Sequence, residues 1–556
     1  MNETNYLIMK KINMKTKSGL LSLFTVIVIA AVIVNSCKKE DIKVNAINLD
    51  QATASVMVGS TLTLNVIFDP FDVTNKDIDW QTDNSSVATV SAGVVSGVTL
   101  GTANITAVSQ DDPTKTAACA ITVIPSNGQQ ITVTGDITTD TKWYTNARYF
   151  LSGFVYVKNN AILTIEPGTI IKGVSGTKGA LIIERGSKIM AQGTSTSPIV
   201  FTSDKPAGQR ASGDWGGVVL CGKATTNKHD SGTGVGVAEG GIGSLYGGTD
   251  DADNSGILKY VRIEFPGIPL TSTPNSEING LTLYSVGTGT TIDHIQVSFS
   301  GDDSYEWFGG TVNCKYLIAL RGLDDEFDTD NGYRGHVQFI LGIRDPNISD
   351  QSGSNGFESD NDADGSVLTP ITKPVFTNAT LLGPLCSTST LPANHLFKRA
   401  MHIRRSSQLC VYNSIFTGWP KGLLIDGTTG NSPTMASNNA LQVEKCILAG
   451  MQTNFEVATG TPVTPYTTTE EQTYFEDATR SNTDDLSVTD IIGSNLLTLT
   501  SPGIMPAAGA SFLTGASFAN SNLNSTFFES VAYKGAFGTT NWTTGWCNFD
   551  PQNAVY

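Results

Sequence analysis

The sequence has few charged residues and little helical pattern. Charged residues make up only 15% of its 556 residues, whereas it contains 56 glycines and 21 prolines. Outside the first forty residues, no long segment repeats apolar side chains with the 3.6-residue period of an amphipathic helix. Many turn residues with little helical periodicity are typical of a β protein. We therefore predict an all-β chain, and its length leaves room for two or three domains.

Residue patterns for several kinds of site are also missing. The eight cysteines form no Cys-x-x-Cys pair and the five histidines are dispersed, so zinc-binding spacing is absent. Cys314, Cys410 and Cys446 lie in apolar strand patterns, which favours buried free thiols; a disulfide among them is the alternative. No Ser/His/Asp or Cys/His set is recognisable, and the glycine-rich stretches lack phosphate-loop spacing. The net charge of −16 argues against nucleic acid as a partner.

The N-terminus has the pattern of an export signal. Four lysines precede an apolar run over residues 20–34, which is too short for a transmembrane helix. Val34-Asn35-Ser36-Cys37 then resembles the lipobox of a bacterial lipoprotein signal. The resemblance implies a signal peptide over residues 1–36, with Cys37 as the lipidated first residue of the mature chain. A plain secretory signal is the alternative.

A short charged tether follows over residues 37–41. Lys38-Lys39-Glu40-Asp41 resembles a surface-export signal of one large group of Gram-negative bacteria, and a merely solvated tether is the alternative. Removal of residues 1–36 would leave 31 basic and 50 acidic residues and a net charge of −19, which fits cation binding and solubility outside the cell. We expect a protein held to the outer membrane by its lipid anchor and exposed at the cell surface.

Residues 42–125 have the pattern of a small β-sandwich. Short strands and turns alternate about every 8–12 residues, and Trp80 is placed as a core tryptophan. Val87-Ala-Thr-Val90 and Gly93-Val-Val95 carry a resemblance to the bacterial Ig-like domains of group 2. The resemblance implies a spacer or an adhesive module rather than an activity.

From residue 131 onwards, short strands recur with a longer period. Strand patterns that begin at Val155, Leu163 and Ile170 are repeated one turn later by patterns that begin at Leu181, Ile189 and Ile199. Three short strands per turn predict a right-handed parallel β-helix over residues 131–457. Residues 458–488 are predicted to be a loop or linker, and the aromatic tail 489–556 to cap the open end of the helix.

The helical region also resembles known proteins. Leu163-Thr-Ile-Glu-Pro-Gly-Thr-Ile-Ile171 is similar to the opening turns of pectate-lyase-like proteins. Segments 278–283, 307–313 and 327–335 resemble a widespread family of extracytoplasmic bacterial β-helix proteins whose biochemical function is not established. The resemblance implies an Ig-like β-sandwich followed by a β-helix of the pectin-lyase-like type, and little about function.

Two acidic segments of the helical region repeat each other at a 22-residue offset. Residues 301–310 align with 323–332, so that each Asp pair falls on the other. On neighbouring turns of a β-helix such carboxylates stack about 4.8 Å apart and repel, which calls for a cation among them. Hard oxygen ligands favour Ca²⁺. The predicted ligands are Asp302, Asp303, Asp324, Asp325, Asp328 and Asp330.

A third acidic segment resembles a calcium loop. Asp360-Asn-Asp-Ala-Asp-Gly365 matches the D-x-D-x-D-G core, which makes Asp360, Asp362 and Asp364 further predicted ligands. Position 371 holds isoleucine instead of glutamate, so other ligands must come from another turn, such as Glu358 or residues 324–330. The alternative is a solvated acidic ridge neutralised by Arg321, Arg334 and Arg344.

These features predict binding rather than catalysis. Trp307 and Tyr333 are candidates for stacking on sugar rings, with burial in the core as the alternative. We expect a non-catalytic, Ca²⁺-stabilised β-helix that presents a binding surface to a glycan or to an outer-membrane protein. The alternative is a polysaccharide lyase or a glycoside hydrolase with Arg321, Arg334 or Arg404 as base. That alternative follows from fold resemblance alone, since no lyase motif matches residue by residue.

Overall fold

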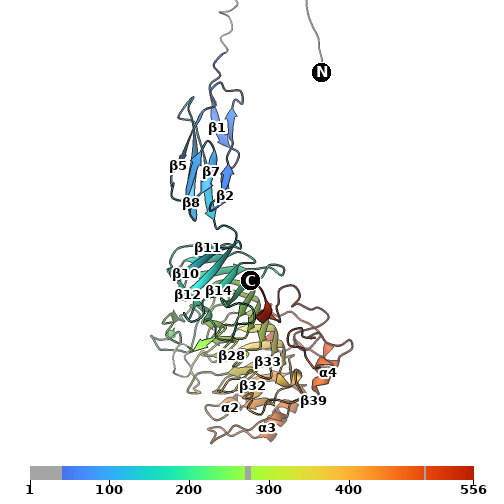
Figure 1. Cartoon of the computed structure of the whole chain (residues 1–556). Coiled ribbons are helices and arrows are strands. Elements are labelled where there is room, and N and C mark those ends of the chain that lie inside the picture. The colour runs from blue at the N-terminus through green and yellow to red at the C-terminus, as the bar shows by residue number, and fades with distance from the viewer. Residues whose placement is uncertain (1–39, 270–276, 494–495) are drawn as a thin grey trace, which may run out of the picture. The chain divides into compact units, whose positions relative to one another are not determined.

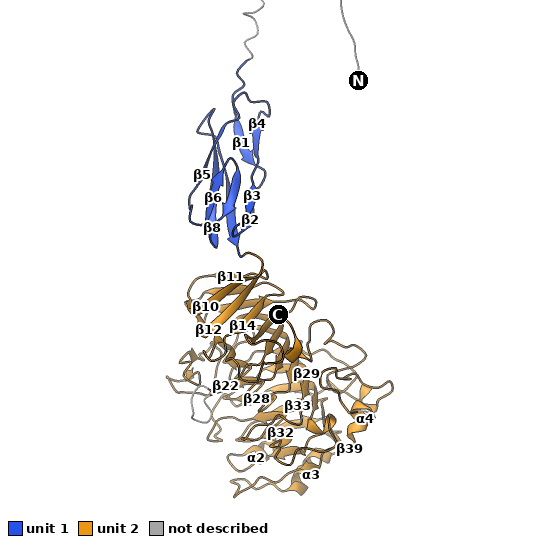
Figure 2. Ribbon diagram, in the orientation of Figure 1, with its two compact units in different colours: residues 1–125 blue, residues 126–556 orange. Residues whose placement is uncertain are grey.

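The computed structural model describes residues 40–269, 277–493 and 496–556. These fall into two compact units, residues 1–125 and residues 126–556 (Figure 2). Cys37 and the predicted lipobox lie outside the described residues. None of the helices within the described ranges is long and apolar enough to cross a membrane.

The first unit is a β-sandwich with its core between two sheets. Apolar residues from both sheets, such as Val56, Val95 and Ile105, are buried together, and Trp80 packs against them. The predicted Ig-like sandwich is therefore confirmed. One sheet has the order β2 (Thr53–Met57), β9 (Thr116–Ile124), β8 (Gly101–Ser109), β5 (Ile78–Thr82); the other has β3 (Thr61–Thr63), β7 (Val94–Gly97), β6 (Ala88–Ser91); and β1 (Ala46–Leu49) pairs with β4 (Val66–Asp69).

The second unit is one long parallel sheet of 26 strands wound into a β-helix (Figure 1). Each strand pairs in parallel with a strand of the next turn: Val155 lies opposite Leu181, and Leu163 opposite Ile189. These are the pairs that the recurrence of the strand patterns predicts. Apolar side chains of successive turns fill a continuous interior. The predicted parallel β-helix is confirmed.

The first half of the helix comprises β10 (Gln129–Ile137), β11 (Thr141–Trp143), β12 (Ala147–Val157), β13 (Ile162–Ile165), β14 (Ile170–Gly173), β15 (Ala180–Ile183), β16 (Lys188–Gln192), β17 (Ile199–Ser203), β18 (Gly217–Cys221), β21 (Gly256–Glu264), β24 (Leu281–Tyr284), β25 (Thr291–Ser298) and β26 (Tyr305–Phe308). Two small antiparallel pairs leave it: β19 (Gly236–Val237) with β20 (Leu245–Tyr246), and β22 (Ile268–Pro269) with β23 (Glu277–Ile278).

The second half comprises β27 (Cys314–Leu320), β28 (Phe327–Asp330), β29 (His336–Ile343), β30 (Phe357–Ser359), β31 (Val375–Leu382), β32 (Arg399–Ile403), β33 (Cys410–Tyr412), β34 (Ile415–Thr417), β35 (Lys421–Ile425), β36 (Gln442–Glu444), β37 (Ile447–Ala449), β38 (Thr453–Phe455) and β39 (Thr483–Leu486). Its helices are α2 (Ser432–Ser437), α3 (Thr468–Glu476) and α4 (Val488–Ile492), with 3₁₀ turns η1 (Pro384–Cys386), η2 (Ser511–Leu513), η3 (Ser521–Leu523) and η4 (Pro551–Asn553).

The C-terminal tail lies along the flank of the helix. Trp546 packs against His294 with ring centroids 5.5 Å apart, and the Tyr556 hydroxyl donates to Glu264 Oε1 at 2.7 Å. Arg210 donates to the carbonyl oxygen of Pro551 at 2.7 Å. These partners belong to early and middle turns, so the prediction that residues 489–556 cap the open end is wrong. The tail instead covers apolar side chains that point outward from the sheet.

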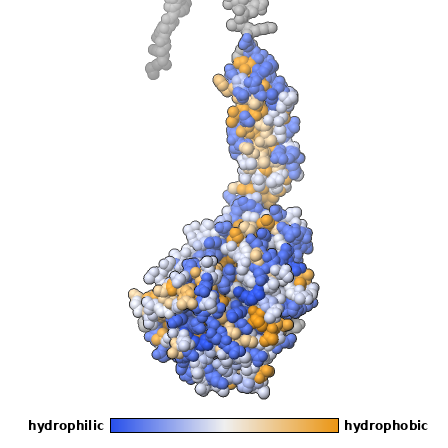
Figure 3. All heavy atoms as spheres, turned by 180° about the vertical axis from the view of Figure 1, so that it is seen from behind, coloured by the Kyte–Doolittle hydropathy of each residue, from blue (hydrophilic) through white to orange (hydrophobic). Residues whose placement is uncertain are grey.

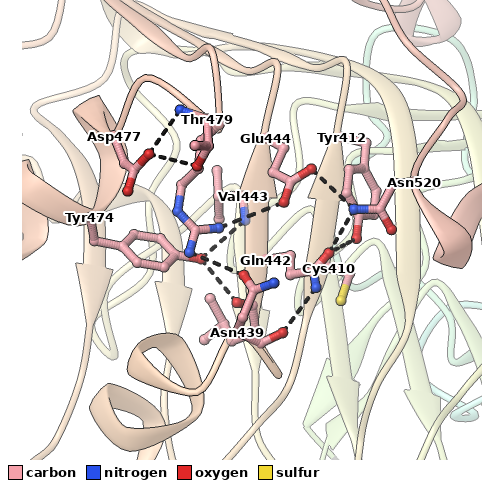
Figure 4. Close-up of polar contacts among 12 residues, drawn as sticks. Cys410, Tyr412, Asn439, Gln442, Val443, Glu444, Tyr474, Asp477, Thr479 and Asn520 are labelled. Atoms are coloured by element: carbon pink, nitrogen blue, oxygen red, sulfur yellow. Dashed lines mark hydrogen bonds and ion pairs between the residues drawn. The ribbon is translucent and has the colours of Figure 1, made fainter.

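The last turn is covered by the segment predicted to be a loop, residues 458–488. Within it, α3 places Tyr474 and Phe475 against the interior of the helix, and β39 pairs with β37. Thr467 and Glu470 form a capping box at the start of α3. The helix was not predicted because the single apolar pair Tyr474-Phe475, in an otherwise polar stretch, does not show the 3.6-residue period of an amphipathic helix. Figure 4 shows Tyr474 facing the strand that carries Gln442 and Val443.

Replacement of Tyr474 by phenylalanine is expected to lower the free energy of unfolding by about 1–2 kcal/mol. The Tyr474 hydroxyl accepts from the backbone N–H of Val443 at 3.1 Å and donates to the carbonyl oxygen of Leu441 at 3.0 Å. Urea unfolding of the two proteins measures the difference. Tyr466→Phe is the control, since its hydroxyl has no hydrogen-bond partner among the described residues, and equal losses in both variants would contradict the prediction.

Most of the visible surface of the second unit in Figure 3 is hydrophilic, with small apolar patches between polar regions. Among the described residues of this unit, the large apolar side chains with the highest exposure are Val555, Val463 and Val367. None of them lines the cleft described next.

Candidate functional site

An acidic cleft of about 390 Å³ opens in the second unit where the two repeated acidic segments meet. Most of the charged side chains that line it are carboxylates. Ten of these carboxylates are Glu239, Glu277, Asp302, Asp303, Glu306, Asp324, Asp325, Asp328, Asp330 and Glu358. Asp360, Lys228, Arg404 and Arg405 complete the charged lining.

The strand register builds one column of these side chains. Glu306 of β26 lies opposite Asp328 of β28, Asp328 opposite Glu358 of β30, and Glu358 opposite His402 of β32. Successive side chains of a strand point to opposite faces. The rings of Tyr305 and Trp307 therefore enter the interior, and the carboxylate between them points outward. The 22-residue offset predicted from the sequence is confirmed by this pairing.

The corners that precede these strands bring the Asp pairs into contact. Asp303 Oδ1 accepts from the backbone N–H of Asp325 at 2.8 Å, and only 7% and 4% of the two residues are exposed. Asp325 in turn accepts from the backbone N–H of Asn355 on the following turn. Ser352 donates to Asp324 Oδ2 at 2.8 Å. The predicted stack of Asp pairs is thus present, and the hydrogen bond from Asn355 connects it to a third turn.

The arginines of the cleft are already paired. Arg404 contacts Glu358 and also donates from Nε to Asp360 Oδ1 at 2.7 Å, while Arg405 Nη1 lies 2.6 Å from Asp360 Oδ2. His402 Nδ1 lies 3.1 Å from Glu358 Oε2. Burial would raise the pKa of Glu358, but Arg404, His402 and Arg405 outweigh it and lower the pKa to about 2.

The remaining carboxylates have no such compensation. Within the described ranges, no Lys, Arg or His forms an ion pair with Asp302, Asp303, Glu306, Asp324, Asp325, Asp328 or Asp330. Burial and the neighbouring carboxylates raise the pKa of Asp302 to about 8 and that of Asp324 to about 7. The same causes hold the pKa values of Asp303, Asp325, Glu306 and Asp328 well above their ordinary range.

The donor set fits a hard divalent cation. Two groups of three carboxylates have ligand oxygens that all lie within 4.8 Å of one another: Asp302 with Asp303 and Asp324, and Asp303 with Glu306 and Asp328. Asp328 Oδ1 is shielded from solvent and has no hydrogen-bond partner among the described residues. Oxygen ligands in this number, without sulfur or imidazole in either group, are those that Ca²⁺ prefers.

The predicted calcium loop at 360–365 does not form one site. Asp360 is held by Arg404 and Arg405, and Asp362 accepts from the backbone and side chain of Ser366 within its own turn. Asp364 is exposed to solvent. The three carboxylates are absent from the groups that converge among the described residues. The prediction of Asp360, Asp362 and Asp364 as joint ligands is therefore wrong, because two of them have nearer partners.

The predicted sugar-stacking residues are also placed differently. Trp307 and Tyr333 are fully buried and stack on each other with ring centroids 5.4 Å apart. They form part of the interior cluster, so neither offers a ring face to a ligand. The prediction of both as ligand-binding residues is wrong. Trp307 points into the interior because successive side chains of a strand point to opposite faces. The acidic residues next to it in the sequence do not determine this direction.

Arg321 and Arg334 lie outside the cleft. Arg321 pairs with Asp345, with 2.5 Å between Nη2 and Oδ2, and beside it is a separate groove of about 730 Å³ that is lined by no other charged residue of the described ranges. Arg334 Nη2 lies 3.1 Å from Asp251 Oδ2. Neither arginine lines the cleft, so neither can act as a base on a ligand bound there. Arg344, expected to neutralise the acidic ridge, instead pairs with buried Glu326.

Several cleft residues carried no sequence signal. Lys228 and Glu239 come from the long excursion between β18 and β21, and Glu277 begins the small strand β23. Arg405 follows β32, and its pairing with Asp360 joins residues 45 positions apart. A single sequence gives no spacing rule for such contacts, because the excursions differ in length from turn to turn.

Comparison with known proteins identifies the two units. A family model described as a pectate-lyase like beta helix domain matches residues 135–490. The chain belongs to this family. In this pectate-lyase-like β-helix protein, a second family model, described as a bacterial Ig-like domain (group 2), matches residues 43–121. A curated relative, 3-O-alpha-D-galactosyl-alpha-L-arabinofuranosidase of Bifidobacterium longum subsp. longum, is 40% identical over 78 residues, which is 14% of this chain and 7% of the relative.

Proposed function

We propose that this pectate-lyase-like β-helix protein is anchored by lipid at the outer membrane and binds a glycan non-catalytically through Ca²⁺ held in the acidic cleft. The observation that best supports this proposal is that seven buried or half-buried carboxylates of the cleft have no ion-pair partner among the described residues. They are Asp302, Asp303, Glu306, Asp324, Asp325, Asp328 and Asp330. Like charges at these separations repel strongly in a partly buried site, and a bound divalent cation offsets that repulsion.

The chemistry of such a site fits a sugar polymer. Ca²⁺ takes six to eight oxygen ligands, so an ion held by three carboxylates keeps positions for hydroxyl or carboxylate oxygens of a ligand. The phenyl and indole side chains beside the acids, Phe308 and Trp307, are buried, so recognition rests on oxygen ligands and charge rather than on ring stacking. The name of the related arabinofuranosidase describes action on carbohydrate, which favours a glycan over a protein as the partner.

Binding of a uronic-acid polysaccharide is expected to weaken at least about tenfold, or 1.4 kcal/mol, when Ca²⁺ is removed with EGTA. Isothermal titration of the purified protein with such a polymer, with and without Ca²⁺, measures the change. Asp303→Asn should reproduce the loss in the presence of Ca²⁺. Asp251→Asn, which changes an exposed carboxylate outside the cleft, is the control and should bind normally. Binding that is indifferent to EGTA would contradict the proposal.

A second candidate function is favoured by one feature of the cleft. Ionised Glu358 lies opposite Asp328, whose pKa is held high by burial and by the Glu358 charge. A carboxylate beside a carboxylic acid is the pair that glycoside hydrolysis uses. Incubation with a panel of polysaccharides, followed by absorbance of unsaturated products and by reducing-end assays, separates the functions. Product formation that Glu358→Gln abolishes would replace binding by catalysis.

A further inference from the structure

We propose that the cleft holds two divalent cations, not one, and that the Asp303 carboxylate bridges them. The inference rests on the proposed Ca²⁺ binding and specifies its stoichiometry. The first ion is assigned to Asp302, Asp303 and Asp324, and the second to Asp303, Glu306 and Asp328.

The geometry separates the carboxylates into two overlapping groups. Oxygens that share one Ca²⁺ lie at most about 5 Å apart, because each is about 2.3–2.6 Å from the ion. The oxygens of each group satisfy that limit, lying within 4.8 Å of one another, and Asp303 is the member common to both. Asp302 and Asp324 stand at the corners before β26 and β28, whereas Glu306 and Asp328 lie on those strands. A bridging carboxylate is typical of sites whose two ions are about 3.5–4 Å apart.

The charge of the cleft favours two ions. The five carboxylates of the two groups carry five negative charges when ionised, and one divalent cation would leave three of them. Asp325 and Asp330 line the same cleft and are likewise without an ion pair in the described ranges. Arg404 and Arg405 are occupied by Glu358 and Asp360. A second divalent cation reduces the residual repulsion within the site.

Two oxygen atoms without partners point independently to a ligand. Asn331 lines the cleft and is only 2% exposed, yet its side-chain oxygen accepts no hydrogen bond from any described residue. Asp328 is half-buried, but its Oδ1 is likewise shielded from solvent and accepts no hydrogen bond from any described residue. A buried acceptor without a donor costs about 1–3 kcal/mol. Both are oxygens of the type that coordinate Ca²⁺. Asp328 belongs to the second group, so the second ion would remove the cost at its Oδ1, whereas Asn331 belongs to neither group.

Counting bound ions tests the inference. The full-length protein is stripped with EGTA, dialysed to equilibrium against Ca²⁺ and analysed for bound calcium, with native mass spectrometry as a second count. We expect two ions per chain. Asp302→Asn and Glu306→Gln should each retain one, because each change removes a ligand from a different group. Asp303→Asn should lower the count below one, and Asp251→Asn should keep two.

The outcomes distinguish this inference from the proposed function. One ion in the unchanged protein, lost in both Asp302→Asn and Glu306→Gln, would overturn the two-ion site and leave Ca²⁺-dependent binding intact. No bound ion at all would overturn both. Two ions that persist in the Asp303→Asn variant would contradict the bridging role. The loss of one ion in Asp302→Asn and of one ion in Glu306→Gln also shows that these variants fold, since a variant that still binds one ion has kept the cleft.

Discussion

Replacement of Arg344 by methionine is expected to destabilise the β-helix by about 3–5 kcal/mol. Arg344 is 1% exposed, and its Nε lies 2.5 Å from Glu326 Oε1. Its Nη1 donates to the carbonyl oxygen of Gly322 at 2.8 Å, and Nη2 donates to that of Asn355 at 2.8 Å. Methionine fills a similar volume but leaves these buried acceptors without donors.

The loss should also reach the cleft. The same guanidinium contacts the carbonyl oxygen of Asp324, so it joins the second acidic corner to the turn that follows. Thermal or urea unfolding measures the stability, and Ca²⁺ binding measures the effect on the corner. Arg334→Met is the matched control, because Arg334 forms an exposed ion pair that contributes at most about 1 kcal/mol. Equal effects of the two changes would contradict the structural role of Arg344.

The calcium-free protein is expected to melt about 5 °C lower at pH 8 than at pH 5. Burial raises the pKa of Asp302 from 3.8 to about 8 and that of Asp330 from 3.8 to about 8 in the folded chain. Between pH 3.8 and about pH 8, these two carboxyl groups bind more protons in the folded protein than in the unfolded chain. Stability from these groups is therefore complete below about pH 4 and is lost as the pH rises through the folded pKa.

Calcium should reverse this dependence. Ion binding requires ionised carboxylates, so the stabilisation by Ca²⁺ grows as the pH rises towards 8. Glu358 does not contribute in this window, because its pKa is lowered to about 2 and its stabilising effect is lost only in stronger acid. Melting curves at pH 5 and pH 8, with EGTA and with Ca²⁺, measure all four conditions. A melting temperature that rises with pH in EGTA, or that Ca²⁺ leaves unchanged at pH 8, would contradict the cation site.

The repeating part of the fold could be predicted from the sequence. In a parallel β-helix each strand pairs with its counterpart one turn later, so the recurrence of an apolar pattern reports the register directly, as it does for Val155 with Leu181. The alignment of Glu306 with Asp328 followed in the same way from the 22-residue offset. Repeat length is set locally by the turns, which is why it can be read from one sequence.

Side-chain partners from different turns could not be predicted. Asp360 and Asp362 matched a calcium loop, but Arg404 and Arg405 reach Asp360 from the next turn. Trp307 stood among the acids in the sequence, and the strand turned it into the interior. The tail after residue 489 was rich in aromatic residues, yet nothing in its sequence specified the flank rather than the end of the helix.

The sequence by itself determined the two folds, the order of the units and the stacking of Asp302 and Asp303 on Asp324 and Asp325, because each depends on patterns repeated at short and regular intervals. Only the tertiary structure decided which carboxylates keep a cationic partner and which converge without one. That distinction depends on side chains from distant parts of the chain, such as Arg404 beside Glu358 and Glu239 at the edge of the cleft. Their distances are fixed by the winding of the whole helix and by excursions of unequal length, and the local sequence contains neither.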